Sequence, residues 1–165
     1  MKEPLPYCTT EKAIKGYCES NLAKLEKNDC VVRAFASCFS VTYDRAHKYV
    51  EEHFNRKRGK GTYSTFSKMG TLVKNKTEIN HKKLNWVGEK INGGPTHTLK
   101  YPVKVKGNEI MRNMTVGTFV KQNPKGTYFI LIRCHALTIK DGTIIGNLED
   151  SQRKRAVIKH AFKIN

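Results

Sequence analysis

Residues 28–41 have the sequence NDCVVRAFASCFSV, and this stretch decides the fold that we expect. Its apolar residues recur every three or four positions, which is the spacing of a single buried face on an α-helix. Asp29 stands where a helix cap is favoured, directly before Cys30. The stretch therefore predicts a buried helix that begins at Cys30.

Cys30 at that position has two interpretations. The start of a helix supplies partial positive charge and free amide groups, which favour a thiolate and so a nucleophilic cysteine. Alternatively, Cys30 is a small buried residue like most free cysteines. Its partner would decide between them, and His135 is the candidate because a neutral imidazole can accept the thiol proton.

His135 lies in the second informative stretch, GTYFILIRCHALTIKDGTIIGN, at residues 126–147. Three strand-like runs, TYFILIR, HALTIK and TIIGN, follow one another with very short links between them. His135 opens the second run, and Cys134 is expected on the opposite face, in the core. Asp141 before Gly142 is interpreted as a turn former rather than a catalytic group.

The link around Asp141 permits two strand registers. A three-residue loop pairs Ile139 with Thr143 and places Asn147 opposite His135, whereas a two-residue turn pairs Asn147 with Ala136. We expect the first register, in which the Asn147 amide orients the imidazole as the third member of a Cys-His-Asn triad. Asp150 is the second choice for that role.

The other segments complete an α+β outline. Helices are expected at residues 19–28, at 42–54 with Thr42 as its cap, at 63–75 and at 115–122. Weak strand character lies at 84–87, a loop at 91–96, and a final strand at 156–164. We therefore expect one domain over residues 1–165. It would have an N-terminal extension (1–27), a helical part (28–74) and a mainly antiparallel sheet (115–165).

Composition limits the setting and the partners. Lys and Arg number 31 against 14 Asp and Glu, a net charge of +17 that attracts acidic proteins, nucleic acid or anionic cell-wall polymers. The five cysteines are irregularly spaced and form no pair typical of a structural zinc site, so we expect reduced thiols in a cytosol. The chemistry that we expect of Cys30 implies neither a metal nor an organic cofactor. No apolar run is long enough for a membrane span or resembles a secretory signal.

The two stretches together resemble small papain-like cysteine peptidase domains of bacteriophages and bacteria, over roughly residues 28–150. In such domains an Asp-Cys pair opens the central helix, a Gly-Thr-Tyr strand precedes a His-Ala strand, and an Asp-Gly turn leads to the third catalytic position. The matching residues are Asp29 and Cys30, 126–128, His135 and Ala136, 141–142 and Asn147. The resemblance implies N-terminal helices, with the nucleophile on the central one, packed on a C-terminal antiparallel sheet.

From these observations we expect a cysteine hydrolase that cleaves a peptide or isopeptide bond. Cys30 would attack the carbonyl, His135 would carry the proton, and the Cys30 amide with Asn28 would bind the oxyanion. The resemblance adds the setting of a phage protein in the host cytoplasm that acts on a host protein. Two alternatives stay open: an inactive papain-like protein that binds nucleic acid or an acidic partner, and an amidase of cell-wall peptides.

Overall fold

The structure is a computed structural model that describes residues 3–62, 66–87 and 98–165. The chain is a mixed α+β structure with seven helices and nine strands in these ranges. The helices are α1 (Thr10–Ala13), α2 (Asn21–Leu25), α3 (Cys30–Phe39), α4 (Tyr43–Phe54), α5 (Phe66–Lys74), α6 (Val116–Gln122) and α7 (Leu148–Gln152). The strands are β1 (Tyr7–Cys8), β2 (Glu78–Ile79), β3 (Lys82–Trp86), β4 (Lys100–Val105), β5 (Asn108–Asn113), β6 (Thr127–Ile132), β7 (His135–Lys140), β8 (Thr143–Ile145) and β9 (Ile158–Ile164).

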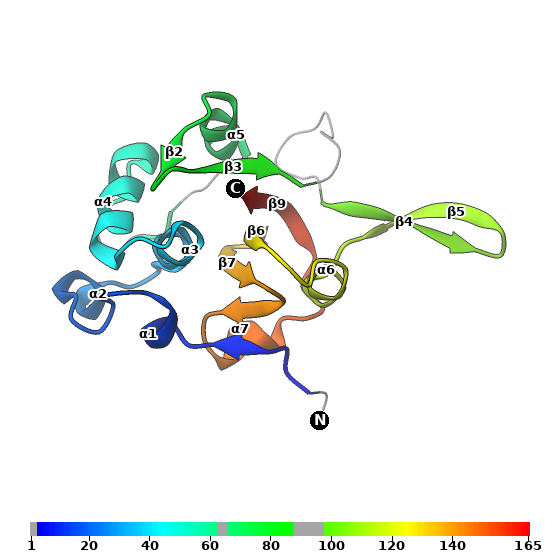
Figure 1. Ribbon diagram of the computed structural model, residues 1–165, viewed down its shortest axis with the longest axis horizontal. Coiled ribbons are helices and arrows are strands. Elements are labelled where there is room, and N and C mark those ends of the chain that lie inside the picture. The colour runs from blue at the N-terminus through cyan, green and yellow to red at the C-terminus, as the bar shows by residue number, and fades with distance from the viewer. Residues whose placement is uncertain (1–2, 63–65, 88–97) are drawn as a thin grey trace.

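A seven-stranded sheet with the order β1-β8-β7-β6-β9-β3-β2 forms the centre of the molecule (Figure 1). All neighbours in it are antiparallel except β1 and β8, which run parallel. The strands β6, β7 and β9 are rich in buried Ile, Phe and Leu, as expected for strands covered on both faces. This sheet is the platform from which His135 projects.

Helices cover both faces of the sheet. On one face α3 packs on the sheet, where the ring of Phe35 contacts that of Phe129, and α4 packs on α3 through a ring contact between Phe54 and Phe35. On the other face α6 packs through Phe119 against a second cluster of buried sheet residues, and Figure 1 shows α3 and α6 on opposite sides. Burial of these aromatic side chains fixes α3, and with it Cys30, on the sheet.

The strands β4 and β5 form a separate two-stranded hairpin that extends away from the rest of the molecule (Figure 1). We call it the arm. All six β5 residues are exposed, and Ile110 and Met111 keep 41% and 57% of their surface accessible. The arm joins the body at Leu99 and Met114, which are buried and share a backbone hydrogen bond of 2.7 Å.

The helix predictions are confirmed where the periodicity was clearest. α3 begins at Cys30, and Thr42 caps α4 by accepting from the Arg45 amide at 3.3 Å. The loop expected at 91–96 lies outside the described residues. Within the described part of the chain, no helix has the length and apolar character needed to cross a membrane.

The predicted register between β7 and β8 is wrong. Ile139 pairs with Ile144 and Lys140 with Thr143, so the link is a two-residue turn of Asp141 and Gly142. Both turn residues have positive φ, 47° and 73°, which suits the twist of an antiparallel hairpin. Asp141 is the predicted turn former, and its Oδ1 also accepts from the Gly126 amide at 2.8 Å.

Candidate active site

The start of α3 is fixed by Asp29, although not by the capping bond that the sequence suggested. Asp29 occupies the N-cap position, but its carboxylate makes no capping hydrogen bond. It accepts instead from Arg33 Nε at 3.0 Å and from the Tyr43 hydroxyl at 2.7 Å. The residue before Cys30 is therefore tied to both α3 and α4.

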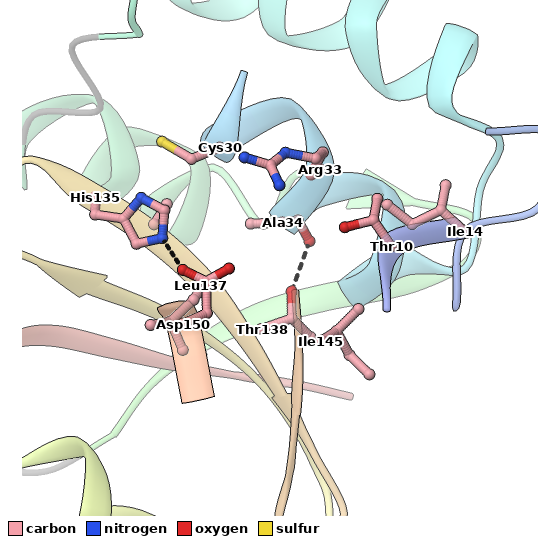
Figure 2. A pocket seen from close by; sticks show the side chains of 11 residues that line it. Thr10, Ile14, Cys30, Arg33, Ala34, His135, Leu137, Thr138, Ile145 and Asp150 are labelled. Atoms are coloured by element: carbon pink, nitrogen blue, oxygen red, sulfur yellow. Dashed lines mark hydrogen bonds and ion pairs between the residues drawn. The ribbon is translucent and has the colours of Figure 1, made fainter. Parts of the chain in front are cut away.

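Two buried hydroxyl groups join α3 to β7 and so bring Cys30 and His135 together. The hydroxyls of Ser37 and Thr138 lie 2.6 Å apart, and Thr138 also donates to the Ala34 carbonyl at 3.2 Å. Such bonds in a dry interface are strong and directional. Figure 2 shows the Cys30 thiol beside the His135 ring, although about 100 residues separate them in the sequence.

His135 begins β7 directly after the tight turn formed by Arg133 and Cys134. Its Nε2 lies 2.7 Å from Asp150 Oδ1, and the His135 side chain is only 16% exposed. The other ring nitrogen, Nδ1, is turned toward Cys30 (Figure 2). The imidazole thus lies between a carboxylate and a thiol, the arrangement that lets a histidine move a proton at one defined nitrogen.

Asp150 is held in the first turn of α7. Its Oδ2 accepts from the Asn147 amide N–H at 3.0 Å, while the Asn147 side chain accepts from the Asp150 N–H at 3.0 Å. This reciprocal pair is a capping box. One carboxylate oxygen of Asp150 therefore accepts a hydrogen bond at the start of α7, and this bond orients the other oxygen toward His135.

Gly146 makes room for that carboxylate. A Cβ atom at this position would collide with the Asp150 Oδ2 atom. The Gly146 N–H donates to the Cys8 carbonyl at 2.9 Å, so the backbone here is held between β1 and the Asp150 side chain. Glycine therefore permits a close approach of the Asp150 side chain that any other residue would prevent without a shift.

Asn147 does not take the role that we predicted for it. It lies beyond the end of β8, and its side chain caps α7 instead of contacting His135. Asp150, the second choice, is the residue at hydrogen-bond distance from the imidazole. The signal was present in the sequence GNLED: Asn followed three residues later by an acidic residue is typical of a capped helix start.

The charges of the three groups stabilise one another. Burial raises the pKa of the Cys30 thiol, but hydrogen bonding to His135 and to the Ala136 backbone, with the charges of His135 and Arg33, brings it below its ordinary value. Burial lowers the pKa of His135, but Asp150 and Cys30 outweigh it and raise that pKa to about 9. Both shifts favour a thiolate beside an imidazolium over a neutral pair.

The pKa of Asp150 is lowered. Burial raises it, but hydrogen bonds from His135 and the Asn147 backbone, together with the charges of His135 and Arg33, outweigh that effect. Asp150 therefore stays ionised while the imidazole carries its proton.

Of the two predicted oxyanion donors, one fits its place. The Cys30 N–H lies in the first turn of α3, where amides lack an intrahelical acceptor. Asn28 has a left-handed φ of 55°, and its side-chain amide donates to the Gly59 carbonyl at 3.5 Å, so the structure does not bring it to Cys30. A side-chain donor for the oxyanion is therefore not provided by Asn28 in this conformation.

The remaining cysteines differ from Cys30. Cys38 is fully buried against Thr138, and burial raises the pKa of its thiol to about 12. Cys134, which we expected in the core, is exposed because it forms the β6–β7 turn with a φ of 55°. Among the described residues, no group of three or more His, Cys, Asp and Glu side chains is placed to hold a metal ion.

The N-terminal segment closes the site from the side of β8 and α7. Ile144 donates to the Pro6 carbonyl at 2.9 Å, and the Leu5 N–H donates to the Ser151 carbonyl at 3.0 Å. Thr10 and Ile14 line a pocket of about 10 Å³ together with Cys30, His135 and Asp150 (Figure 2). A volume of this size holds roughly one water molecule.

Comparison of the chain with models of protein families, with curated proteins and with solved structures finds no match in any of the three.

Proposed function

We propose that the protein is a thiol hydrolase that cleaves a peptide or isopeptide bond, with Cys30, His135 and Asp150 as its catalytic residues. The observation that carries the proposal is the position of the His135 ring, with Nε2 at 2.7 Å from Asp150 and Nδ1 turned toward Cys30 at the start of α3. A structural histidine needs only one such partner. Two opposed partners, one of them a thiol of lowered pKa, are the pattern of an activated nucleophile.

In the first half of the reaction, the Cys30 thiolate attacks the carbonyl carbon of the scissile bond. A carbon–sulfur bond forms, and the electron pair of the carbonyl moves to its oxygen, where the Cys30 N–H donates a hydrogen bond. When the tetrahedral intermediate collapses, the carbon–nitrogen bond breaks and the leaving amine takes the proton from His135 Nδ1. Asp150 stabilises the imidazolium before this transfer and fixes the ring orientation.

In the second half, the neutral His135 takes a proton from water, and the hydroxide attacks the thioester. The carbon–sulfur bond then breaks, which releases the carboxylic acid and returns Cys30 as thiolate and His135 as imidazolium. No further oxidant, reductant or metal enters this balance.

The size of the pocket favours a chain-like substrate over an enclosed small molecule. Sites that enclose small ligands usually have volumes of about 300–1,000 Å³. The pocket at Cys30 has about 10 Å³, so most of a substrate would lie across the surface. A peptide segment of a protein suits this shape. We extend the proposal to the fold: a papain-like arrangement is supported by the helices α1 to α5, which precede every strand of the sheet except β1, and by a nucleophile at the start of the buried helix α3.

The proposal is tested by labelling the native protein with an electrophilic peptide that mimics the acyl-enzyme, followed by mapping of the modified cysteine with mass spectrometry. We expect rapid, selective modification of Cys30 that is abolished in Cys30→Ala and at least tenfold slower in His135→Ala. Slow and equal modification of Cys18, Cys30 and Cys134 in the wild type, unchanged in His135→Ala, would refute the hydrolase. Circular dichroism of each variant shows that its fold is retained.

The assignment of Asp150, rather than Asn147, as the third catalytic residue beside Cys30 and His135 is tested by comparing Asp150→Asn with Asn147→Ala. Asp150→Asn removes the charge that raises the His135 pKa, so the labelling of Cys30 near neutral pH should slow at least tenfold. Asn147→Ala removes a cap worth about 0.5–2 kcal/mol of stability and should slow labelling much less. A larger effect of Asn147→Ala on labelling than of Asp150→Asn would reverse the assignment.

A binding protein without turnover is the second candidate. It is favoured by the net charge of +17 and by the exposed arm with Ile110 and Met111. Salt-sensitive binding of an anionic partner that persists in Cys30→Ala, together with the absence of selective labelling, would favour this candidate over the hydrolase.

A further inference from the structure

The link between α4 and α5 carries a dense group of positive charges. We call residues 55–61, with the sequence NRKRGKG, the basic loop. Three of its cations, Lys57, Arg58 and Lys60, are exposed, whereas Arg56 is 5% exposed. The loop therefore separates one buried cation from three that face solvent.

Arg56 anchors the basic loop to the segment that leads into α3. Its side chain and that of Glu26 are each 1% exposed, and the two form an ion pair at 2.5 Å. His47 of α4 lies 3.1 Å from Glu26 and 3.2 Å from Arg56 through its Nε2 atom. Arg56 also donates to the Lys27 carbonyl at 3.2 Å.

Two further contacts bring the loop close to the nucleophile. The Gly59 N–H donates to Glu26 Oε2 at 3.3 Å, and the Asn28 side chain donates to the Gly59 carbonyl at 3.5 Å. Asn28 is two residues before Cys30, and two residues of chain span at most about 7 Å. The basic loop is therefore held next to the first turn of α3, which begins at Cys30.

The buried ion pair of Glu26 and Arg56 is an unfavourable way to hold a loop whose role is only structural. A buried ion pair often stabilises a fold no better than apolar residues of the same size, because both charges lose their hydration. Here the pair holds a loop with no apolar side chain, and Glu26 neutralises only Arg56. Three cations of the loop and the exposed Lys27 have no partner of opposite charge within salt-bridge distance among the described residues.

We propose that the basic loop binds acidic side chains of the substrate next to the scissile bond. This inference rests on the proposed function and names its substrate class: segments of protein that carry Asp or Glu close to the bond that is cleaved. Carboxylates of a bound chain would lie within reach of Lys57, Arg58 and Lys60, while Cys30 attacks the neighbouring carbonyl.

The experiment uses two peptide probes that carry a Michael acceptor in place of one peptide bond. The acidic probe has two Glu residues on each side of the acceptor, and the neutral probe has Gln at the same four positions. The rate constant for modification of Cys30 is measured with each probe by mass spectrometry. Their ratio reports the preference for acidic substrates on either side of the reacting group.

The test variant is K57Q/R58Q/K60Q, and the control variant is K100Q/K104Q/R112Q. The control removes the same number of Lys and Arg charges from exposed positions of the arm. We expect the wild type and the control to prefer the acidic probe by roughly fivefold or more, and the test variant to lose that preference. In 1 M salt, where the screening length falls to about 3 Å, the wild-type preference should also disappear.

The outcomes separate this inference from the function on which it rests. Selective modification of Cys30 by both probes at equal rates would overturn the inference and leave the hydrolase in place. A preference lost equally in the test and control variants would also overturn it, because overall charge would then suffice. Failure of both probes to modify Cys30 selectively would refute the hydrolase, and this inference with it.

Discussion

His135 contacts groups of opposite chemical character at its two ring nitrogens, a carboxylate at Nε2 and a thiol at Nδ1. Because Asp150 and Cys30 raise its pKa from 6.5 to about 9, the imidazolium persists through neutral pH. The pKa of Cys30 moves the opposite way, below its ordinary value. The thiolate and the imidazolium therefore coexist in the pH range between these two pKa values.

This range predicts two pH dependences. Alkylation of Cys30 by iodoacetamide needs only the thiolate, so its rate should rise at a lower pH in the wild type than in His135→Ala.

The stability that His135 gains from its partners is present in full below pH 6.5 and is lost as the pH rises through about 9. Thermal melts should therefore separate the wild type from His135→Ala more at pH 6 than at pH 10. An equal separation at both values would contradict the raised pKa.

Substitution of Gly146 should slow the labelling of Cys30 through its effect on Asp150. In Gly146→Ala the new methyl group would displace the Asp150 carboxylate, so the His135 pKa should fall and Cys30 labelling should slow about as much as in Asp150→Asn. The control is Gly70→Ala in α5, where an added Cβ meets only Trp86 at an ordinary 3.7 Å. Labelling by Gly146→Ala at the wild-type rate would show that the site tolerates the displacement.

At the scale of elements, the Glu26–Arg56 pair predicts a large effect on stability. Glu26→Gln leaves the Arg56 charge buried without its partner, which costs about 3–5 kcal/mol. Glu78→Gln, which breaks the exposed pair with Lys83, should leave the melting temperature nearly unchanged. Because Arg56 and His47 outweigh the effect of burial and lower the Glu26 pKa to about 2, the difference should persist at pH 4.5 and shrink only as the pH falls toward 2. Equal melting temperatures for the two variants would contradict the buried anchor.

The elements that the sequence predicted well are those with a strong period. α3, α4 and β6 have apolar residues at the spacing of their buried faces, and each was expected close to its observed bounds. The arm was not expected, because β5 is exposed throughout and no residue of β4 is fully buried. α7 was missed because it has only five residues and its capping signal stands inside a run that was assigned to the sheet.

Two residues of the candidate site could be predicted from the sequence, and the third could not, for a physical reason. Cys30 and His135 follow from local signals, a helix start and a strand start. The third residue depends on strand register, and the Asp-Gly pair at 141–142 suits two turn lengths equally well. The contact between Asp141 and the Gly126 amide, 15 residues away, belongs to the two-residue turn that the structure adopts. This contact joins residues that are distant in the sequence, so the local pattern around residues 141–142 does not reveal it.

At the scale of the whole molecule, the separation of the arm from the seven-stranded sheet predicts that the rest of the protein folds without the arm. Leu99 and Met114 are joined by a backbone hydrogen bond, so an Asn-Gly turn in place of residues 100–113 can close the chain between them. Since most arm residues are exposed, the melting temperature should fall by only a few degrees and Cys30 labelling should be unchanged. Loss of the folded state in this deletion variant would show that the arm supports the sheet.

The order of Cys30, His135 and Asp150 along the chain has a consequence during protein synthesis. Cys30 leaves the ribosome early, but Asp150, and the strand β8 that holds α7 against the N-terminal segment, are made about 120 residues later. At roughly 5–20 residues per second, the growing chain spends several seconds with its thiol present and its acid–base partner unmade. During that time the thiol lacks the imidazolium that lowers its pKa. The arrangement of Cys30, His135 and Asp150 therefore cannot form before residue 150 has been made, so the proposed hydrolase would have no activity toward the proteins around the ribosome until then.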